Sequence, residues 1–443
     1  MNCNSRDEIA NAISDMPVIN HHDHAWRSFS VDHGPEFDLP SYLYLDYLGQ
    51  ADLAAAGCPE DPSLFDYLSD PQMSDGAERA WEALRPFLDT VRSTSFFRYL
   101  LRGLNDLFDI TEEDVFSNRW REASERIRQY SREHKGQGSE LCRRMGVVAT
   151  VLDGKIEAAR IRRMDLGNHR ILYVARLDHF IHEGRGLVNI LSRYSTKDFA
   201  QWLAAFDAFF FRSIEEGAVG FKSGLAYNRR IEYSDPSKDD AARIFERGLL
   251  TASPAEKLIY QDFMVNRLCR LCVEAAVPLQ IHTGIQTRMG HTLEDARPTL
   301  LTGLFRRHGD LRVDLFHGGY PWCVHAGLMA KYFPNVYING CWLHHISPSA
   351  YRAALTAWIE TVPLNKIFAW GGDHSSMLEH SYASLSLAKD LVADVMADLV
   401  DRGYFDVELA LAVTKRIFHD NGAEFWHLDN KDEACTGVQR HVQ

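Results

Sequence analysis

Residues 17–24 read Pro-Val-Ile-Asn-His-His-Asp-His, a short apolar run that ends in a histidine-rich cluster. Side chains two residues apart on a strand share a face, so we expect His22 and His24 to project together from the strand end. His21 and Asp23 should then point the other way. Two neutral imidazoles on one face are suitable ligands for Zn²⁺ or a similar divalent cation.

Seven further short apolar runs follow along the chain, and longer amphipathic stretches separate most of them. These runs are residues 146–152, 169–177, 218–221, 278–281, 312–316, 336–339 and 366–370. Eight apolar strands that alternate with helices predict an α/β fold, a parallel (β/α)8 TIM barrel. A doubly wound open sheet is the alternative, but the Gly-rich phosphate-binding turn that such a sheet usually carries is missing from the sequence.

The connection between the first two predicted strands is far too long for a loop without structure of its own. It contains four helical patterns and many aromatic residues, so we expect a helical insertion at about residues 35–144. The insertion covers the barrel mouth as a lid, or serves packing or oligomer contacts, and these roles are compatible with each other. The helical patterns are residues 41–48, 77–89, 95–109 and 111–132.

The rest of the chain fits one domain. We expect residues 1–428 to form the barrel with its insertion, helical after Asp373, and residues 429–443 to form a polar tail. Cys269 and Cys272 have CxxC spacing within the predicted helix 257–276, and we expect them to pack in the core, because no second CxxC accompanies them.

Composition narrows the classes of function. The 443 residues carry 61 acidic and 48 basic side chains, a formal net charge of −13, which argues against a nucleic-acid-binding protein. An anionic small substrate remains compatible, because a local cationic pocket can exist in an acidic protein. The N-terminus lacks a signal-peptide pattern, and no uninterrupted apolar stretch is long enough to span a membrane. We therefore expect a cytoplasmic protein without a membrane partner; a homo-oligomer is compatible with the sequence.

Later strand ends repeat the polar pattern of the first. His282 ends the fifth predicted strand, His317 ends the sixth, and Asp373 follows the eighth. Each alone is compatible with a hydrogen-bonded core residue. The C-terminal strand ends of a closed barrel converge on one mouth, so together with His22 and His24 they predict a metal site there.

This arrangement resembles the amidohydrolase superfamily, and more closely its "amidohydrolase 2" branch. The resemblance is carried by the HxH of the first strand, by Lys222 on the fourth and by the strand-end residues above. Three segments are similar to that branch: residues 218–230, 280–284 and 418–423. The long insertion resembles the uronate isomerase group of the same superfamily.

The resemblance implies a role for each matching residue. His22, His24, His282 and Asp373 are implied ligands of one divalent cation per chain, Zn²⁺ or another such as Mn²⁺. Asp373 is also implied in proton transfer. His317 is implied either as a ligand of a second metal or as a residue that polarises substrate or transfers a proton. It could also donate to a developing oxyanion. Lys222 is a carboxylated bridge in two-metal members, but we favour one metal, with Lys222 binding substrate.

Other residues suggest what the substrate carries. Arg27, Lys222 and Arg288 follow strand ends and would suit a carboxylate, although surface loop charges give the same pattern. Trp322 either lines an apolar wall of the site or packs against the insertion.

We therefore expect a metal-dependent hydrolase that acts on an amide, ester or ring C–N bond of a small, anionic molecule. A bound Zn²⁺ would lower the pKa of water to roughly 7 and supply hydroxide at neutral pH. Non-oxidative decarboxylation of a carboxylic acid and isomerisation of a sugar acid are the catalytic alternatives. A metal-binding scaffold without turnover is the non-catalytic one.

Overall fold

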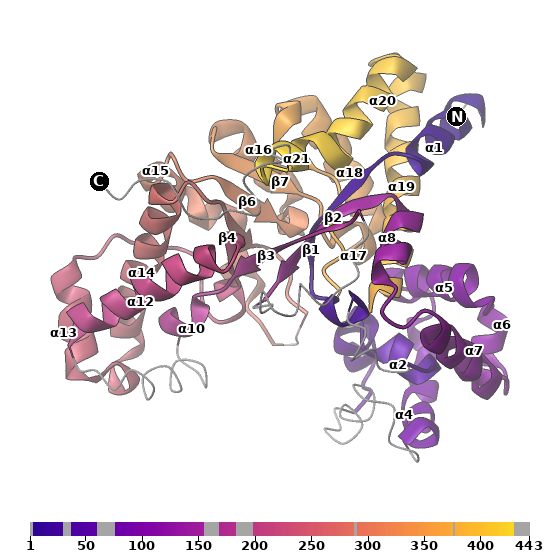
Figure 1. The fold of residues 1–443 in the computed structure, drawn as a ribbon, viewed down its shortest axis with the longest axis horizontal. Helices are drawn as coiled ribbons and strands as arrows, with labels where there is room; N and C mark the ends of the chain where they lie inside the picture. Colours follow the sequence, from indigo (N-terminus) through magenta and orange to yellow (C-terminus); the bar gives the residue numbers. More distant parts are fainter. Residues whose placement is uncertain are drawn as a thin grey trace.

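Eight parallel strands form one sheet in sequential order. Figure 1 shows strands of this sheet near the centre of the molecule. The computed structural model describes residues 3–29, 37–59, 76–154, 168–182, 198–287, 290–374 and 377–428. Each of the eight predicted runs overlaps one strand, so the predicted strand positions are confirmed to within a few residues. The strands are β1 (Val18–Asp23), β2 (Val147–Asp153), β3 (Arg170–Ala175), β4 (Ala218–Ser223), β5 (Leu279–His282), β6 (Val313–Phe316), β7 (Val336–Asn339) and β8 (Ile367–Phe368).

The eight strands form a nearly closed barrel, in which the segment after β8 is hydrogen-bonded to the end of β1. The backbone N–H of Asp373 donates to the carbonyl oxygen of His22 at 2.8 Å, and the N–H of His24 donates to His374 at 3.1 Å. These bonds lie at the C-terminal ends of both strands. The predicted (β/α)8 barrel is therefore confirmed.

Helices surround the strands and bury their apolar faces against them (Figure 1). Cys269 and Cys272 both lie fully buried on α14, as predicted for core residues. The helices outside the β1–β2 connection are α1 (Cys3–Ser14), α10 (Asp178–Ile181), α12 (Phe199–Glu215), α13 (Lys238–Gly248), α14 (Pro254–Glu274), α15 (Thr302–Arg307), α16 (Cys323–Tyr332), α17 (Leu343–Ile346), α18 (Pro348–Thr361), α19 (Leu378–Asp401), α20 (Val407–Lys415) and α21 (Asn421–Phe425).

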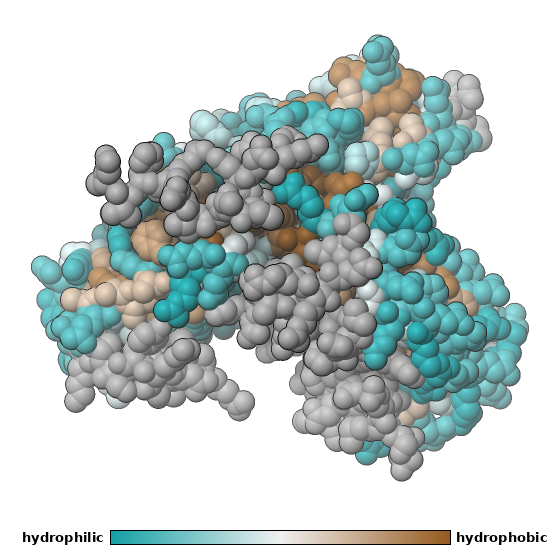
Figure 2. Space-filling view, viewed as in Figure 1, coloured by the Kyte–Doolittle hydropathy of each residue, from teal (hydrophilic) through white to brown (hydrophobic). Residues whose placement is uncertain are grey.

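The β1–β2 connection is helical, and its helices gather at the lower right of Figure 1. Figure 2 shows mostly hydrophilic residues over this group. Its buried side chains form a second apolar cluster that also includes Phe316, Trp342 and Met377 from the barrel, so it packs on the barrel's mouth. The helices are α2 (Leu39–Tyr44), α4 (Gly76–Val91), α5 (Ser95–Phe108), α6 (Glu112–Phe116), α7 (Trp120–Glu133) and α8 (Gly138–Met145), with a π-helix η2 (Leu48–Leu53).

Two of the four helices predicted in this connection differ from the structure. The predicted helix 111–132 is two helices, because Ser117 is extended (φ −93°, ψ −176°) and its Oγ accepts from the N–H of Arg119 at 3.2 Å. This local bond competes with helix continuation. The predicted helix 41–48 ends at Tyr44, and η2 begins only at Leu48.

No helix among the described residues combines the length and the apolar character needed to cross a membrane.

A buried histidine just before β3 predicts how stability depends on pH. His169 is 6% exposed and its Nδ1 lies 3.0 Å from the Val147 carbonyl oxygen. Burial lowers the pKa of His169 to about 4, against an ordinary value of 6.5. The neutral ring therefore stabilises the folded protein above pH 6.5, and this contribution is lost as the pH falls toward 4.

The expected difference between wild type and His169→Asn follows from this pKa. Between pH 6.5 and 4 the free energy of unfolding of the wild type should fall by about 1.4 kcal/mol per pH unit more than that of the variant. Urea unfolding at a series of pH values measures both slopes. Equal slopes would contradict the prediction.

Candidate metal centre

The orientation of His22 is set by a chain of buried amides and carboxylates inside the barrel. Its Nδ1 lies 3.0 Å from Oε1 of Gln280 on β5. The amide nitrogen of Gln280 donates to the His21 carbonyl at 3.0 Å and to Asp314 Oδ2 at 2.8 Å, so Oε1 is the accepting atom. His22 therefore carries its proton on Nδ1 and a lone pair on Nε2. Such an outer contact is typical of histidines that bind a metal.

Four donor atoms converge at the ends of β1, β2 and β8. Nε2 of His22 lies 3.4 Å from Asp153 Oδ2 and 3.4 Å from Asp373 Oδ1. Nε2 of His24 lies 3.2 Å from Asp373 Oδ1 and 3.9 Å from Asp153 Oδ2. Ligands at 2.0–2.1 Å around a tetrahedral metal are separated by about 3.3 Å. The spacings of His22 and His24 from Asp373 fit two ligand pairs of one divalent cation. His22, His24 and Asp153 form one group of donor atoms within 4.8 Å of one another, and Asp373 also belongs to a second such group with His317 and Cys341.

Charge and hydrogen bonding support the same conclusion. The buried Nε2 of His22 has no hydrogen-bond partner among the described residues and faces two carboxylates. Burial opposes ionisation of Asp373, but the imidazoles of His24 and His317 hold its pKa well below the usual range. A lone pair and ionised carboxylates that face one another are stabilised by a cation between them.

Asp153 was not predicted, although its position follows the same rule as the predicted residues. It is the last residue of β2, just as His282 is the last residue of β5. Burial opposes ionisation of Asp153, but the Arg176 guanidinium helps to hold its pKa well below the usual range. Arg176 Nε lies 2.8 Å from both carboxylate oxygens. Asp153 is thus both a candidate ligand and the partner of a fixed arginine.

His282 lies beside this set but presents a different nitrogen. Its Nε2 is 3.0 Å from the Ile285 carbonyl, which only accepts, so the lone pair of a neutral ring is on Nδ1. Its ring centroid lies 4.4 Å from that of His317 and 4.6 Å from that of Tyr227. The predicted ligand role of His282 stays a prediction and would require Nδ1.

His317 presents an acceptor toward Asp373. Its Nδ1 lies 3.2 Å from the Cys341 carbonyl and donates there, which leaves a lone pair on Nε2, 3.6 Å from Asp373 Oδ2. Burial lowers the pKa of His317 to about 3, so the ring is neutral at pH 7. In this state Nε2 accepts a proton or binds a cation. It does not supply the donor to an oxyanion that the sequence suggested.

The backbone at three consecutive strand ends is strained. His317, Trp342 and Asp373 follow β6, β7 and β8 and adopt φ values of 72°, 66° and 58°. These left-handed conformations are costly for residues with a side chain and concentrate at functional sites. The close approach beside Asp373 requires glycine, because a Cβ on Gly372 would lie 2.4 Å from Asp23 Oδ2.

Lys222 reaches the same mouth from β4. It is 2% exposed, and its Nζ lies 3.8 Å from the centre of the Phe316 ring and 4.0 Å from Asp153 Oδ2. Burial, followed by the nearby Arg176, lowers the pKa of Lys222 to about 8. Lys222 is still mostly cationic at pH 7 and provides one positive charge beside the donor set.

The other predicted substrate-binding residues, Arg27, Arg288 and Trp322, have no described contact with the donor set. Arg288 and the side chain of Arg27 lie outside the described residues. Trp322 is half-buried before α16, with the Arg297 guanidinium 6.0 Å from its ring centre, and no described contact joins it to the four donors.

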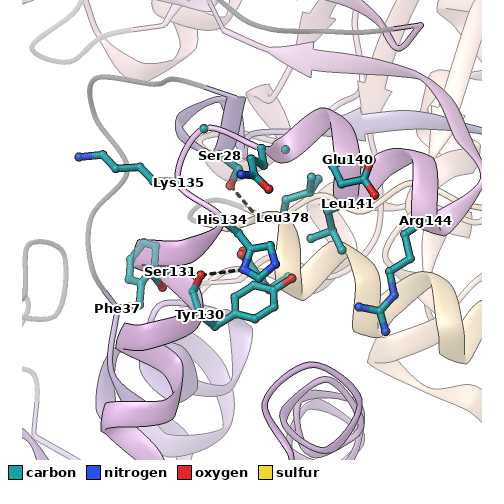
Figure 3. A pocket seen from close by; sticks show the side chains of 14 residues that line it. Ser28, Phe37, Tyr130, Ser131, His134, Lys135, Glu140, Leu141, Arg144 and Leu378 are labelled. Carbon is teal, nitrogen blue, oxygen red and sulfur yellow. Dashed lines mark hydrogen bonds between the residues drawn. The ribbon is translucent and has the colours of Figure 1, made fainter.

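A separate pocket of about 150 Å³ lies between the α7–α8 turn and the start of α19 (Figure 3). In Figure 3, His134 lies over Tyr130, with ring centroids 4.1 Å apart, and Arg144 comes from α8. None of the four donor residues lines this pocket, so it is not the metal site.

Comparison with known proteins identifies related sequences and folds. The sequence model of the family described as Amidohydrolase matches residues 205–428. The glucuronate isomerase of Caulobacter crescentus has a similar structure, with a TM-score of 0.75 and 16% identity over 97% of this chain and 95% of that one. A protein from Lactobacillus casei assigned as a metal-dependent hydrolase has a TM-score of 0.66 and 17% identity, over 95% of this chain and 98% of the other.

A curated relative matches part of the chain. Protein fluG of Emericella nidulans is 26% identical over 240 residues, which is 51% of this chain. The match spans 28% of the length of fluG.

The donor set predicts how metal content depends on single residues. His22→Ala and His24→Ala should each lower the divalent-metal content by about one equivalent per chain, because each removes a ligand of one cation. Plasma mass spectrometry of desalted protein measures this content. His325→Ala, which replaces an exposed histidine on α16, is the matched control and should leave it unchanged. Unaltered metal content in both site variants would contradict the proposed ligands.

Proposed function

Because the chain belongs to the amidohydrolase family, we propose that it is a metal-dependent hydrolase for an amide, ester or ring C–N bond of a small, carboxylate-bearing molecule. The observation that carries the proposal is the convergence of His22, His24 and Asp373 at spacings of 3.2–3.4 Å at the barrel mouth. Asp153 adds a fourth donor atom, the second oxygen, to this set.

One catalytic cation per chain fits this donor set, with imidazole and carboxylate ligands that suit Zn²⁺ or Mn²⁺. When bound, such a cation acts as a Lewis acid that polarises a substrate carbonyl and makes a water molecule more acidic.

Asp373 is the proposed proton carrier. Its Oδ1 faces His22 and His24, whereas its Oδ2 faces the lone pair of His317 at 3.6 Å. One oxygen thus belongs to the donor set while the other is able to take a proton from the attacking water and return it to the leaving group. The neutral His317 accepts at Nε2 and provides a second place for that proton.

Lys222 is the proposed contact for an anionic substrate. Burial against the Phe316 ring fixes the ammonium group of Lys222 at the mouth. Its Nζ is 4.0 Å from Asp153 Oδ2, which is too long for a hydrogen bond, so a substrate carboxylate would be a better partner for its charge. The nearby Arg176, whose side chain is 41% exposed, adds a second cation that the substrate can reach.

Sugar-acid isomerisation is the second candidate. It is favoured by the likeness to the glucuronate isomerase, which extends over 97% of this chain and therefore includes most of the helical β1–β2 connection. The donor set itself does not distinguish proton transfer between carbons from attack by water.

A substrate screen distinguishes these reactions. The metal-loaded protein is tested with N-acyl amino acids, lactones, aromatic acids and uronates in ¹⁸O-labelled water. Incorporation of ¹⁸O into a product carboxylate supports hydrolysis. A ketose product from a uronate would instead establish isomerisation, and CO₂ release without ¹⁸O incorporation into the organic product would establish decarboxylation.

Asp373→Asn should separate proton transfer from metal binding. The substitution keeps the size of the side chain but removes its charge and basicity. We expect kcat to fall roughly 10²–10⁴-fold, as for loss of a general acid–base group, with part of the metal retained. Steady-state kinetics and metal analysis on the same samples measure both effects. A kcat within twofold of wild type would exclude Asp373 as the proton carrier.

Lys222→Met should mainly weaken substrate binding. Loss of a charge-assisted contact should raise KM for an anionic substrate roughly 10- to 100-fold. Lys222→Arg, which keeps the charge, should recover part of this loss. Metal content should stay at the wild-type value in both variants. Loss of metal from Lys222→Met would instead indicate a lysine that bridges two cations.

A further inference from the structure

A second cluster of metal-binding side chains lies where the helical β1–β2 connection meets the barrel. Asp46 follows α2, His374 follows Asp373 at the end of β8, and His380 lies in the first turn of α19. Their exposures are 2%, 0% and 0%. One donor atom from each residue lies within 4.8 Å of the others.

Hydrogen bonding fixes the accepting atom of His380. Its Nε2 lies 3.0 Å from the Tyr42 carbonyl oxygen, which only accepts, so Nε2 carries the proton. The lone pair is therefore on Nδ1, 4.0 Å from Asp46 Oδ1. Burial lowers the pKa of His380 to about 4, which keeps this ring neutral at pH 7.

The atoms of this cluster lack enough hydrogen donors. His374 Nδ1 lies 2.9 Å from Asp46 Oδ1, which accounts for one carboxylate oxygen. The other oxygen, Oδ2, and His380 Nδ1 are buried and have no hydrogen-bond partner among the described residues. His380 Nδ1 thus lies 4.0 Å from a carboxylate oxygen without a proton between them, and Asp46 Oδ2 is a second buried acceptor without a donor among the described residues. Such acceptors are costly to bury unless a cation or water supplies the missing partner.

We infer that Asp46, His374 and His380 form a second divalent-cation site, separate from the candidate catalytic centre. One carboxylate and two imidazoles are the ligand types that Zn²⁺ and similar cations prefer. His345 is the nearest further candidate, because its ring centroid lies 5.1 Å from that of His374 and its Nε2 is buried without a partner among the described residues.

Without a cation, a proton on His374 Nδ1 lies between this nitrogen and Asp46 Oδ1. Burial opposes protonation of His374, but the Asp46 carboxylate outweighs it and raises the pKa of the ring. The same negative charge attracts a divalent cation, and a cation that binds at Nδ1 releases the proton there to solvent.

The site would connect two parts of the fold. Asp46 belongs to the β1–β2 connection, whereas His374 and His380 belong to the segment after β8. A cation shared by these residues would hold the connection on the barrel mouth. Its role is thus structural and does not depend on which reaction the catalytic centre performs.

Anomalous diffraction from crystals of the wild-type protein equilibrated with millimolar Zn²⁺ tests this site directly. We expect one peak among His22, His24 and Asp373 and a second among Asp46, His374 and His380. A peak at the first position alone overturns this inference and leaves the proposed function intact. A peak at the second position alone supports the inference and contradicts the catalytic ligand set, and no peak at either position contradicts both.

Metal analysis in solution gives an independent result. Wild type and His325→Gln should each bind two equivalents of Zn²⁺ per chain, whereas His380→Gln and His24→Ala should each bind one. A Zn²⁺ content of His380→Gln equal to that of the wild type would overturn the second site. If His380→Gln does not fold, the wild-type stoichiometry and the diffraction peaks decide the question.

Discussion

The hydrogen bond from the Asp373 N–H to the His22 carbonyl, 2.8 Å long, connects the last strand of the barrel to the first. It closes the sheet at the end where the candidate ligands lie. It also places the side chains of these two residues 3.4 Å apart. Gly371 and Gly372 permit the approach, since a Cβ on Gly371 would lie 2.7 Å from Cys341 Sγ. Barrel closure and assembly of the metal site are thus one event.

The strands and most residues of the candidate site could be predicted, because in a barrel the position of a residue relative to its strand determines where it lies in space. A polar residue just after an apolar run lies at the mouth, wherever the run is in the chain. This rule selects His22, His317 and Asp373, and in the structure His22 and His317 both lie beside Asp373. Asp153 obeys the same rule. It was missed because a single aspartate before a glycine also has the composition of an ordinary turn. The residues contributed by the insertion follow no such rule. Asp46 meets His374 only through tertiary packing.

The sequence identifies histidines but not which nitrogen each one presents. That choice depends on carbonyl and amide oxygens distant in the chain: Gln280 for His22 and the Cys341 backbone for His317. These acceptors place both lone pairs on Nε2 and toward Asp373. For His282 the acceptor is local, the Ile285 carbonyl, and the lone pair is on the other nitrogen. Ligand roles that family resemblance treats as equivalent therefore differ in geometry from one ring to the next.

The contacts of the insertion bear on its two predicted roles, covering the barrel mouth and packing against the barrel. Asp46 contacts His374, and the hydroxyl of Tyr47 donates to the backbone carbonyl of Asp373, so two consecutive residues of the insertion contact two consecutive residues after β8. Packing against the barrel and covering its mouth are therefore not alternatives for this segment. Moving it would remove a hydrogen bond from a candidate metal ligand. The two contacts therefore connect the position of the insertion to the backbone geometry of the candidate metal centre.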